Sequence, residues 1–121
     1  MSVHKFRDLK VWQRAIAYVA RIYEVTGSFP AAEQFGLTSQ LRRAATTIPL
    51  NIAEGAGSGT DAEFRRFLRI SFRSVYEVMT IVEIAHRLGF LTANVHNELI
   101  AEADELAAMM HGLISTIGAR L

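Results

Sequence analysis

The chain has 121 residues, half of them hydrophobic and none of them cysteine. This length fits one domain with its own apolar core, and a sequence without cysteine excludes disulfide frameworks and thiolate metal sites. The formal net charge is only +1, yet eleven of the 13 basic residues are arginine. No stretch is apolar enough for a signal peptide or a membrane span, so we expect a cytoplasmic protein without membrane contact.

The first segment with helical periodicity covers residues 8–26. Two apolar rows run along it at three-to-four spacing. One row consists of Leu9, Trp12, Ile16, Val19 and Tyr23, and the other consists of Val11, Ala15, Tyr18, Ile22 and Val25. A helix in a small bundle needs only one such row to face the core. We therefore expect the surplus apolar surface to form a contact between subunits.

The second segment runs from residue 38 to residue 55 and contains Pro49. Because proline lacks an amide hydrogen and crowds the carbonyl four residues earlier, we expect one kinked helix; two helices that meet at Pro49 are the alternative. Asn51 and Glu54 follow in an apolar context, where an unpaired carboxylate is costly. We interpret them as a structural polar pair, with Glu54 buried against an arginine of this helix or the next.

The third and fourth segments cover residues 61–88 and 93–118. Thr60 and Glu63 have the spacing of a capping box at the start of a helix. The third segment also has apolar positions beyond those that one bundle seam needs, and no segment has strand periodicity. The sequence therefore predicts an all-α fold, an antiparallel up-down four-helix bundle in a single domain (residues 1–121), which assembles as a homo-oligomer.

The sequence has no motif typical of catalysis or metal binding. Gly55, Gly57 and Gly59 follow no strand and precede no Gly-Lys-Ser/Thr, so an interhelical turn explains them better than a phosphate-binding loop. No two of the four histidines have metal-ligand spacing on one helix, and no serine stands in a nucleophile motif. We therefore predict no enzymatic activity, no catalytic residue, no cofactor and no metal.

Arginines are concentrated on the second and third segments. The candidate nucleic-acid-binding residues are Arg42, Arg43, Arg65, Arg66, Arg69 and Arg73. Arg65, Arg69 and Arg73 are four residues apart, which places them on one helix face. One interpretation is a surface that binds the phosphates of a nucleic acid. The alternative is a solvated face, or a set of ion pairs with nearby glutamates.

Several short motifs occur in an order that resembles one protein family. They are F-R-D-L-x-V-W-Q at Phe6–Gln13, F-P-x-x-E-x-F-G-L at Phe29–Leu37, Q-L-R-R-A-A-x-x-I-P-x-N-I-A-E-G at Gln40–Gly55, E-F-x-x-F-L-x-I at Glu63–Ile70, S-x-x-E at Ser74–Glu77 and L-G-F-L at Leu88–Leu91. Each motif alone is weak evidence. In combination they resemble the four-helix bundle proteins encoded within 23S rRNA intervening sequences.

The resemblance implies a homo-oligomer, a ring of five subunits. The family is similar to the accessory variability proteins of diversity-generating retroelements, basic pentamers that associate with reverse transcriptase and nucleic acid. By this analogy Arg42 and Arg43, inside the matched motif, are the best-supported contact residues. The arginines of the third segment rest on charge pattern alone. Phe72-Arg73 departs from the family, which more often has a basic residue followed by glycine there.

These observations lead to one functional prediction and one alternative. We predict a non-enzymatic homopentamer that binds RNA or DNA through its arginines. The alternative is a protein-only scaffold, or an accessory protein with a protein partner, whose arginines form ion pairs between subunits.

Overall fold

The computed structural model describes residues 5–121, which form four α-helices and no strand. The helices are α1 (Lys10–Thr26), α2 (Leu37–Ala56), α3 (Asp61–Arg87) and α4 (Ala93–Gly118), and two short 3-10 helices are η1 (Lys5–Asp8) and η2 (Ala31–Glu33). The first helix begins later than expected, because the chain turns through η1 before α1 starts. Residues 1–4, which include His4, lie outside the described range. The all-α, four-helix fold is confirmed.

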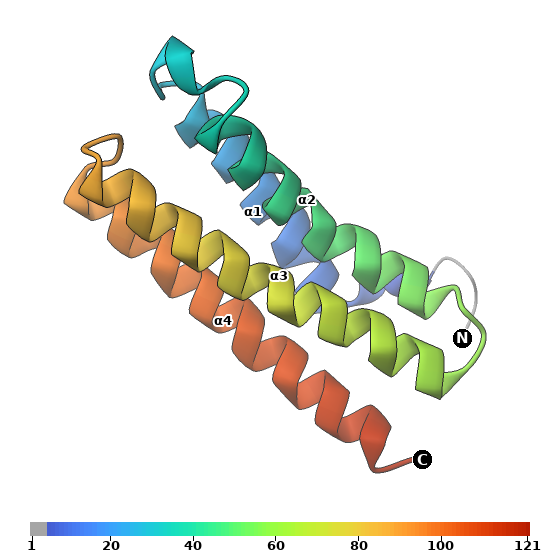
Figure 1. Cartoon of the computed structure of the whole chain (residues 1–121). Coiled ribbons are helices and arrows are strands. Elements are labelled where there is room, and N and C mark those ends of the chain that lie inside the picture. Colours follow the sequence, from blue (N-terminus) through green and yellow to red (C-terminus); the bar gives the residue numbers. More distant parts are fainter. Residues whose placement is uncertain (1–4) are drawn as a thin grey trace.

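The helices alternate in direction and lie side by side as an up-down bundle (Figure 1). Each helix packs against the next along the chain, and α1 also contacts α4, which closes the bundle. The α2–α3 turn lies at one end of the bundle, together with the start of α1 and the end of α4. The α3–α4 turn lies at the other end. Within residues 5–121, no helix is both long and apolar enough to cross a membrane.

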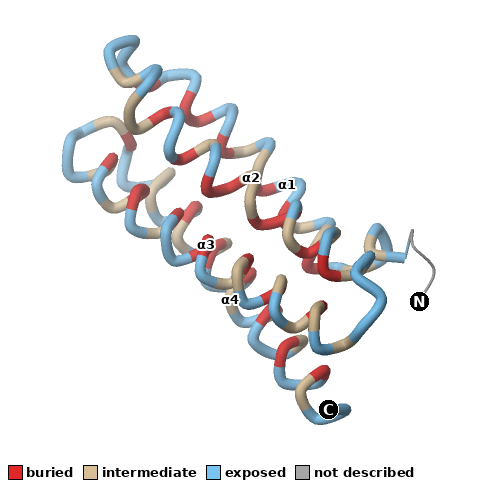
Figure 2. Tube along the Cα trace, turned by 45° about the vertical axis from the view of Figure 1, so that its right-hand side comes forward, coloured by how far each residue is buried: buried red, intermediate tan, exposed pale blue. Residues whose placement is uncertain are grey.

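The core lies along the inward sides of all four helices (Figure 2). Its largest fully buried side chains include Ile22, Leu41, Ile48, Ile52, Leu68, Leu99, Leu106, Met110 and Ile117. In α1 the inward row is the one that contains Val11, Tyr18 and Ile22. Ile16 and Tyr23, from the neighbouring row, are 44% and 47% exposed. Leu9, Trp12 and Val19 of the same row are partly buried against the core, so this row is only partly covered in the single chain.

Helix α2 passes through Pro49 without a break, so two separate helices at this point are excluded. Pro49 is itself buried in the helix packing. Beside it, the Ser71 hydroxyl of α3 donates a buried 2.6 Å hydrogen bond to the carbonyl oxygen of Ile48. This bond joins α2 to α3 and satisfies the hydroxyl of a fully buried serine.

Gly55 allows α2 and α3 to approach closely where they meet. A Cβ atom at this position would lie 2.7 Å from the Phe67 Cβ and 3.2 Å from the Phe64 carbonyl oxygen. Both of these atoms are held by the α3 backbone and cannot rotate away. The glycine that ends the N-I-A-E-G motif is therefore required by packing rather than by an unusual backbone angle.

We expect Gly55→Ala to destabilise the fold by about 1–3 kcal/mol, because the added methyl group overpacks the α2–α3 contact. Gly112→Ala is the matched control, since a Cβ there meets nothing within 4 Å. Alanine favours a helix interior over glycine by roughly 0.5–1 kcal/mol, so the control should gain stability. Urea unfolding followed by circular dichroism measures both changes. Equal stabilisation of the two variants would contradict the packing role of Gly55.

Candidate nucleic-acid interface

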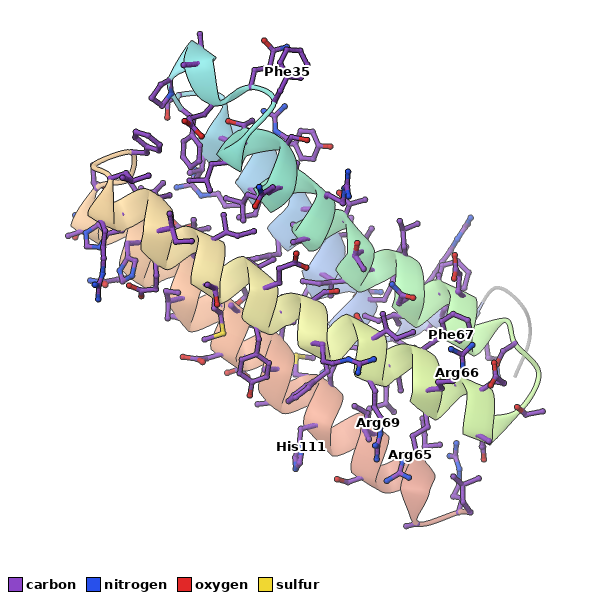
Figure 3. All side chains as sticks on the ribbon, in the orientation of Figure 1. Phe35, Arg65, Arg66, Phe67, Arg69 and His111 are labelled. Carbon is purple, nitrogen blue, oxygen red and sulfur yellow. The ribbon has the colours of Figure 1, made fainter. Side chains whose placement is uncertain are left out.

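Arg65, Arg69 and Arg73 lie on the side of α3 that borders α4, and we call these three residues the arginine face. They border a hollow of about 360 Å³ that is lined by Arg65, Arg69, Phe72, Arg73, His111, Ile114 and Ser115. Figure 3 shows Arg65 and Arg69 directed toward the C-terminal half of α4, on the side where His111 also lies. The predicted spacing of these arginines thus gives one continuous cationic face.

Arg65 makes a contact within the chain. Its Nε donates a 3.2 Å hydrogen bond to the carbonyl oxygen of Ile114, near the C-terminal end of α4. Gly118 leaves room for the guanidinium, since a Cβ there would lie 2.6 Å from Arg65 Nη2. A cation is favourable at this position because the C-terminal end of a helix carries a partial negative charge. Arg65 therefore helps to hold α3 and α4 together.

Arg69 and Arg73 are both exposed, and neither guanidinium forms an ion pair or a hydrogen bond with any residue between 5 and 121. No acidic residue occurs at positions 64–76 of α3 or 106–118 of α4. The two acids at the start of α3 already have partners: Asp61 pairs with Arg120 at 3.1 Å, and Glu63 pairs with an arginine at 3.0 Å. Glu77, four residues after Arg73, is the nearest acid on the same face of α3 and forms no ion pair with it, so both guanidiniums are available for an anion.

Arg66 stands one turn before Arg69 on α3, but its side chain contacts Glu63 and Phe67 and does not border α4. Its Nε and Nη2 each donate a 3.0 Å hydrogen bond to the Glu63 carboxylate, which lowers the pKa of Glu63. The guanidinium carbon also stands 4.5 Å from the centre of the Phe67 ring, and both side chains appear beside the end of α2 in Figure 3. Its charge is thus neutralised locally.

Arg42 contacts α1 and is partly buried. Its Nε donates a 2.8 Å hydrogen bond to the Thr26 hydroxyl, and its Nη2 donates a 3.3 Å hydrogen bond to the Tyr23 carbonyl oxygen. The guanidinium also lies 4.4 Å from the centre of the Tyr23 ring. Arg43 is exposed, and its guanidinium has no ion pair or hydrogen bond among the described residues. Of the two arginines in the motif, Arg42 therefore holds α2 against α1, and only Arg43 has a guanidinium that is available to bind a partner.

The six candidate arginines do not form one surface. Arg42 and Arg43 border a separate hollow of about 530 Å³, on the side of α2 that faces α1. Phe35, which lines the same hollow, lies at the opposite end of the bundle from Arg65 and Arg69 (Figure 3). The sequence could not separate the two groups, because it does not show which helix each arginine contacts.

The expected buried pair of Asn51 and Glu54 is wrong for the single chain. Glu54 is exposed and has no ion pair within residues 5–121. The Asn51 Nδ2 donates a 2.9 Å hydrogen bond to the Thr47 carbonyl oxygen of its own helix. The inward face of α2 carries Ile48 and Ile52, and successive residues of a helix are 100° apart, so Glu54 points away from the core.

Ion pairs between α1 and α4 neutralise the acidic half of α4. Arg14 forms a bidentate ion pair with Glu102. Arg21 forms a bidentate ion pair with Glu98, in which the Arg21 Nε lies 2.7 Å from the Glu98 Oε2. The hydrogen bonds from Arg21 lower the pKa of Glu98. Glu105 is also within 3.7 Å of Arg14, whereas Asp104 forms no ion pair among the described residues. The C-terminal half of α4, residues 106–118 beside the arginine face, has no acidic residue to offset the arginines.

Two histidines that are ten positions apart in the sequence meet in space. The rings of His86 and His96 stack with their centres 4.3 Å apart, and the His96 Nε2 lies 2.6 Å from the Glu83 Oε1. The hydrogen bond to Glu83 raises the pKa of His96, with a second contribution from Asn97, and lowers the pKa of Glu83. Spacing along one helix missed this group, because the α3–α4 turn brings its members together.

Comparison with known proteins identifies the family. No curated protein is similar enough to the chain to match it. The chain has the fold of a protein of unknown function from the S23 ribosomal protein family of Bacteroides thetaiotaomicron: the TM-score is 0.81 at 20% identity, over 87% of this chain and 95% of that one. Residues 7–112 match the sequence profile described as 23S rRNA-intervening sequence protein. With most of its length matched, the chain belongs to the 23S rRNA-intervening sequence protein family.

Proposed function

We propose that this protein is a non-enzymatic homo-oligomeric bundle that binds RNA through Arg69 and Arg73. The observation that carries the proposal is the pair of exposed arginines whose guanidiniums have no partner in residues 5–121, on a stretch of α3, residues 64–76, that contains no acid. A guanidinium matches the geometry of a phosphate oxygen pair and keeps its charge at any physiological pH. Two such groups on one helix face can contact successive phosphates of a nucleic-acid backbone.

RNA is the first nucleic acid to test. The description of the family refers to an intervening sequence in 23S rRNA, and the name of the similar structure refers to a ribosomal protein family. Phe72, which lines the hollow beside the arginine face, is half-buried, whereas His111, which lines the same hollow, and Tyr76, which packs against Phe72, are exposed. Backbone contact predicts binding that depends on structure and charge more than on sequence.

The outer face of α1 and α2 supports self-association. It has an apolar groove of about 440 Å³, lined by Phe6, Trp12, Ile16, Val19, Ala20, Thr46, Pro49, Leu50 and Ala53. Leu50 is 54% exposed and, with the other apolar residues of the groove, forms a contiguous apolar patch of the kind that marks protein–protein contacts. Arg43 and Glu54 are exposed on the same helix and offer opposite charges to a second subunit. We assign this face to the contact between subunits, in a ring of five.

In this proposal the apolar groove on α1 and α2 forms the contact between subunits, and the arginine face binds RNA. Contact through α1 and α2 would leave the arginine face of every subunit free, and several copies on one ring would bind one RNA with higher avidity than a single subunit. By analogy with the accessory variability proteins, we extend the proposal to a protein partner. The rival function is a protein-only scaffold, which is favoured by the use of Arg42, Arg65 and Arg66 in contacts within the chain.

The variant Arg69→Ala/Arg73→Ala should bind a structured RNA at least about tenfold more weakly at 0.1 M salt, because two phosphate contacts per subunit are lost. The slope of log K against log[salt] should become shallower by roughly 1.4–1.8 for each subunit engaged. Fluorescence anisotropy across a salt series measures both quantities. Lys10→Ala/Arg87→Ala removes the same charge from other exposed positions and is the control. Equal RNA binding by the two double variants would favour the scaffold.

Leu50→Glu should dissociate the oligomer while the helical content stays unchanged, because a charge in the apolar groove must be desolvated for two subunits to meet. Light scattering coupled to gel filtration measures the mass. Leu88→Glu is the matched control, since Leu88 is 58% exposed and lies outside the groove. A wild-type protein that is monomeric at micromolar concentration would contradict the assembly directly.

A further inference from the structure

Glu83, His86 and His96 come together where α3 turns into α4. Glu83 and His86 are one turn apart near the end of α3, and His96 lies in the first turn of α4. The carboxylate oxygen and imidazole nitrogens that could act as ligands all lie within 4.8 Å of one another. We propose that these three side chains form a binding site for a divalent transition-metal ion of the Zn²⁺ type.

The donor atoms select the class of ion. Two imidazole nitrogens and one carboxylate oxygen suit zinc and its neighbours in the first transition series, whereas Mg²⁺ and Ca²⁺ prefer sites built wholly from oxygen. Three protein ligands leave at least one coordination position to water. The Glu83 side chain is 47% exposed and that of His96 is 15% exposed, so an ion can reach the group from solvent.

Asn97 orients one of the ligands. Its Oδ1 lies 3.0 Å from the His96 Nδ1, where it can accept the proton of that nitrogen. The Nε2 of the same ring donates a hydrogen bond to the Glu83 Oε1, 2.6 Å away; a metal ion would displace the proton of this bond and bind the Nε2 lone pair beside the carboxylate. A hydrogen bond from the far nitrogen of a ligand histidine to a fixed oxygen is the usual way that proteins set the tautomer of a metal ligand.

The distances require only a small adjustment. Zn–N and Zn–O bonds of about 2.0–2.2 Å in tetrahedral geometry place neighbouring ligand atoms roughly 3.3–3.5 Å apart. The Glu83 Oε1 and His96 Nε2 at 2.6 Å must therefore separate by less than about 1 Å, which the exposed glutamate side chain permits. The stacked rings of His86 and His96 are 23° from parallel, and a rotation of the His86 side chain aims its nitrogen at the ion.

The backbone that carries the ligands is held in place. Gly89 has a φ of 82°, a left-handed conformation that ends α3. The Phe90 amide donates to the Ala85 carbonyl oxygen at 2.9 Å, and the Val95 amide donates to the Thr92 hydroxyl that caps α4. Both helix ends are therefore defined before an ion binds, which lowers the entropy cost of forming the site. Arg87 is the neighbouring cation and reduces the affinity without blocking the group.

A bound ion would join the ends of α3 and α4, at the end of the bundle opposite to Arg65 and Arg69. The site is thus independent of the proposed RNA surface. A failure of either proposal leaves the other one intact.

Isothermal titration of the full-length protein with Zn²⁺ should show one ion bound per chain. Zn²⁺ in hundredfold excess over Kd should raise the Tm by several degrees, a chelator should reverse the rise, and Mg²⁺ should have no effect. Co²⁺ should give visible absorption bands of a low-coordinate nitrogen–oxygen site. Failure of the wild-type protein to bind Zn²⁺ at concentrations up to 1 mM, roughly the weak limit of specific ligand affinity, overturns the proposal.

Variants locate the ion. Glu83→Gln and His96→Ala should each weaken Zn²⁺ binding at least about tenfold and abolish the Co²⁺ bands, as loss of a ligand requires. Glu77→Gln, an exposed glutamate earlier on the same helix, should bind like the wild type. If the His96→Ala variant loses helical content in the absence of metal, its weaker Zn²⁺ binding could come from misfolding. The Zn²⁺ affinity of the Glu83→Gln variant, whose replaced side chain is 47% exposed, then tests the assignment. Equal affinity of Glu83→Gln and Glu77→Gln would place the ion elsewhere and overturn the assignment.

Discussion

The close contact between the end of α2 and the start of α3 determines how the rest of the bundle is arranged. Gly55 has no side chain, so the two backbones can approach at Phe64 and Phe67. The Ser71 hydroxyl then fixes the register through its bond to the Ile48 carbonyl oxygen. Because the side of α3 that carries Phe64, Phe67 and Ser71 packs against α2, the arginine face borders α4 and solvent. The motif that ends at Gly55 thus acts through packing, and its influence on binding is indirect.

The arginines of this chain serve two purposes that the net charge of +1 conceals. Arg42 and Arg65 hold helices together by donating to carbonyl oxygens near the negative C-terminal ends of α1 and α4. Arg14 and Arg21 pair with the acids of α4. What remains is a local excess of positive charge at the arginine face, and such an excess, rather than total charge, governs contact with a phosphate backbone.

The sequence predicts the helices well, because apolar periodicity and caps are local properties of the chain. It could not choose between the two apolar rows of α1, since both rows have helical spacing and only packing against α2 and α4 decides. Glu54 was misplaced for a similar reason: its neighbours are apolar, but its angular position faces outward. The contacts of Arg65 with Ile114 and of His86 with His96 join different helices, and no single-helix spacing reveals them.

The most direct test of the proposed function is to map which arginines an RNA covers. Arginine-selective chemical modification, read by mass spectrometry with and without a structured RNA, compares every exposed guanidinium in one experiment. RNA should protect Arg69 and Arg73, while Arg43 and Arg87 should react equally in both samples. Protection centred on Arg43, or no change at Arg69 and Arg73 when RNA is bound, would contradict the proposed function.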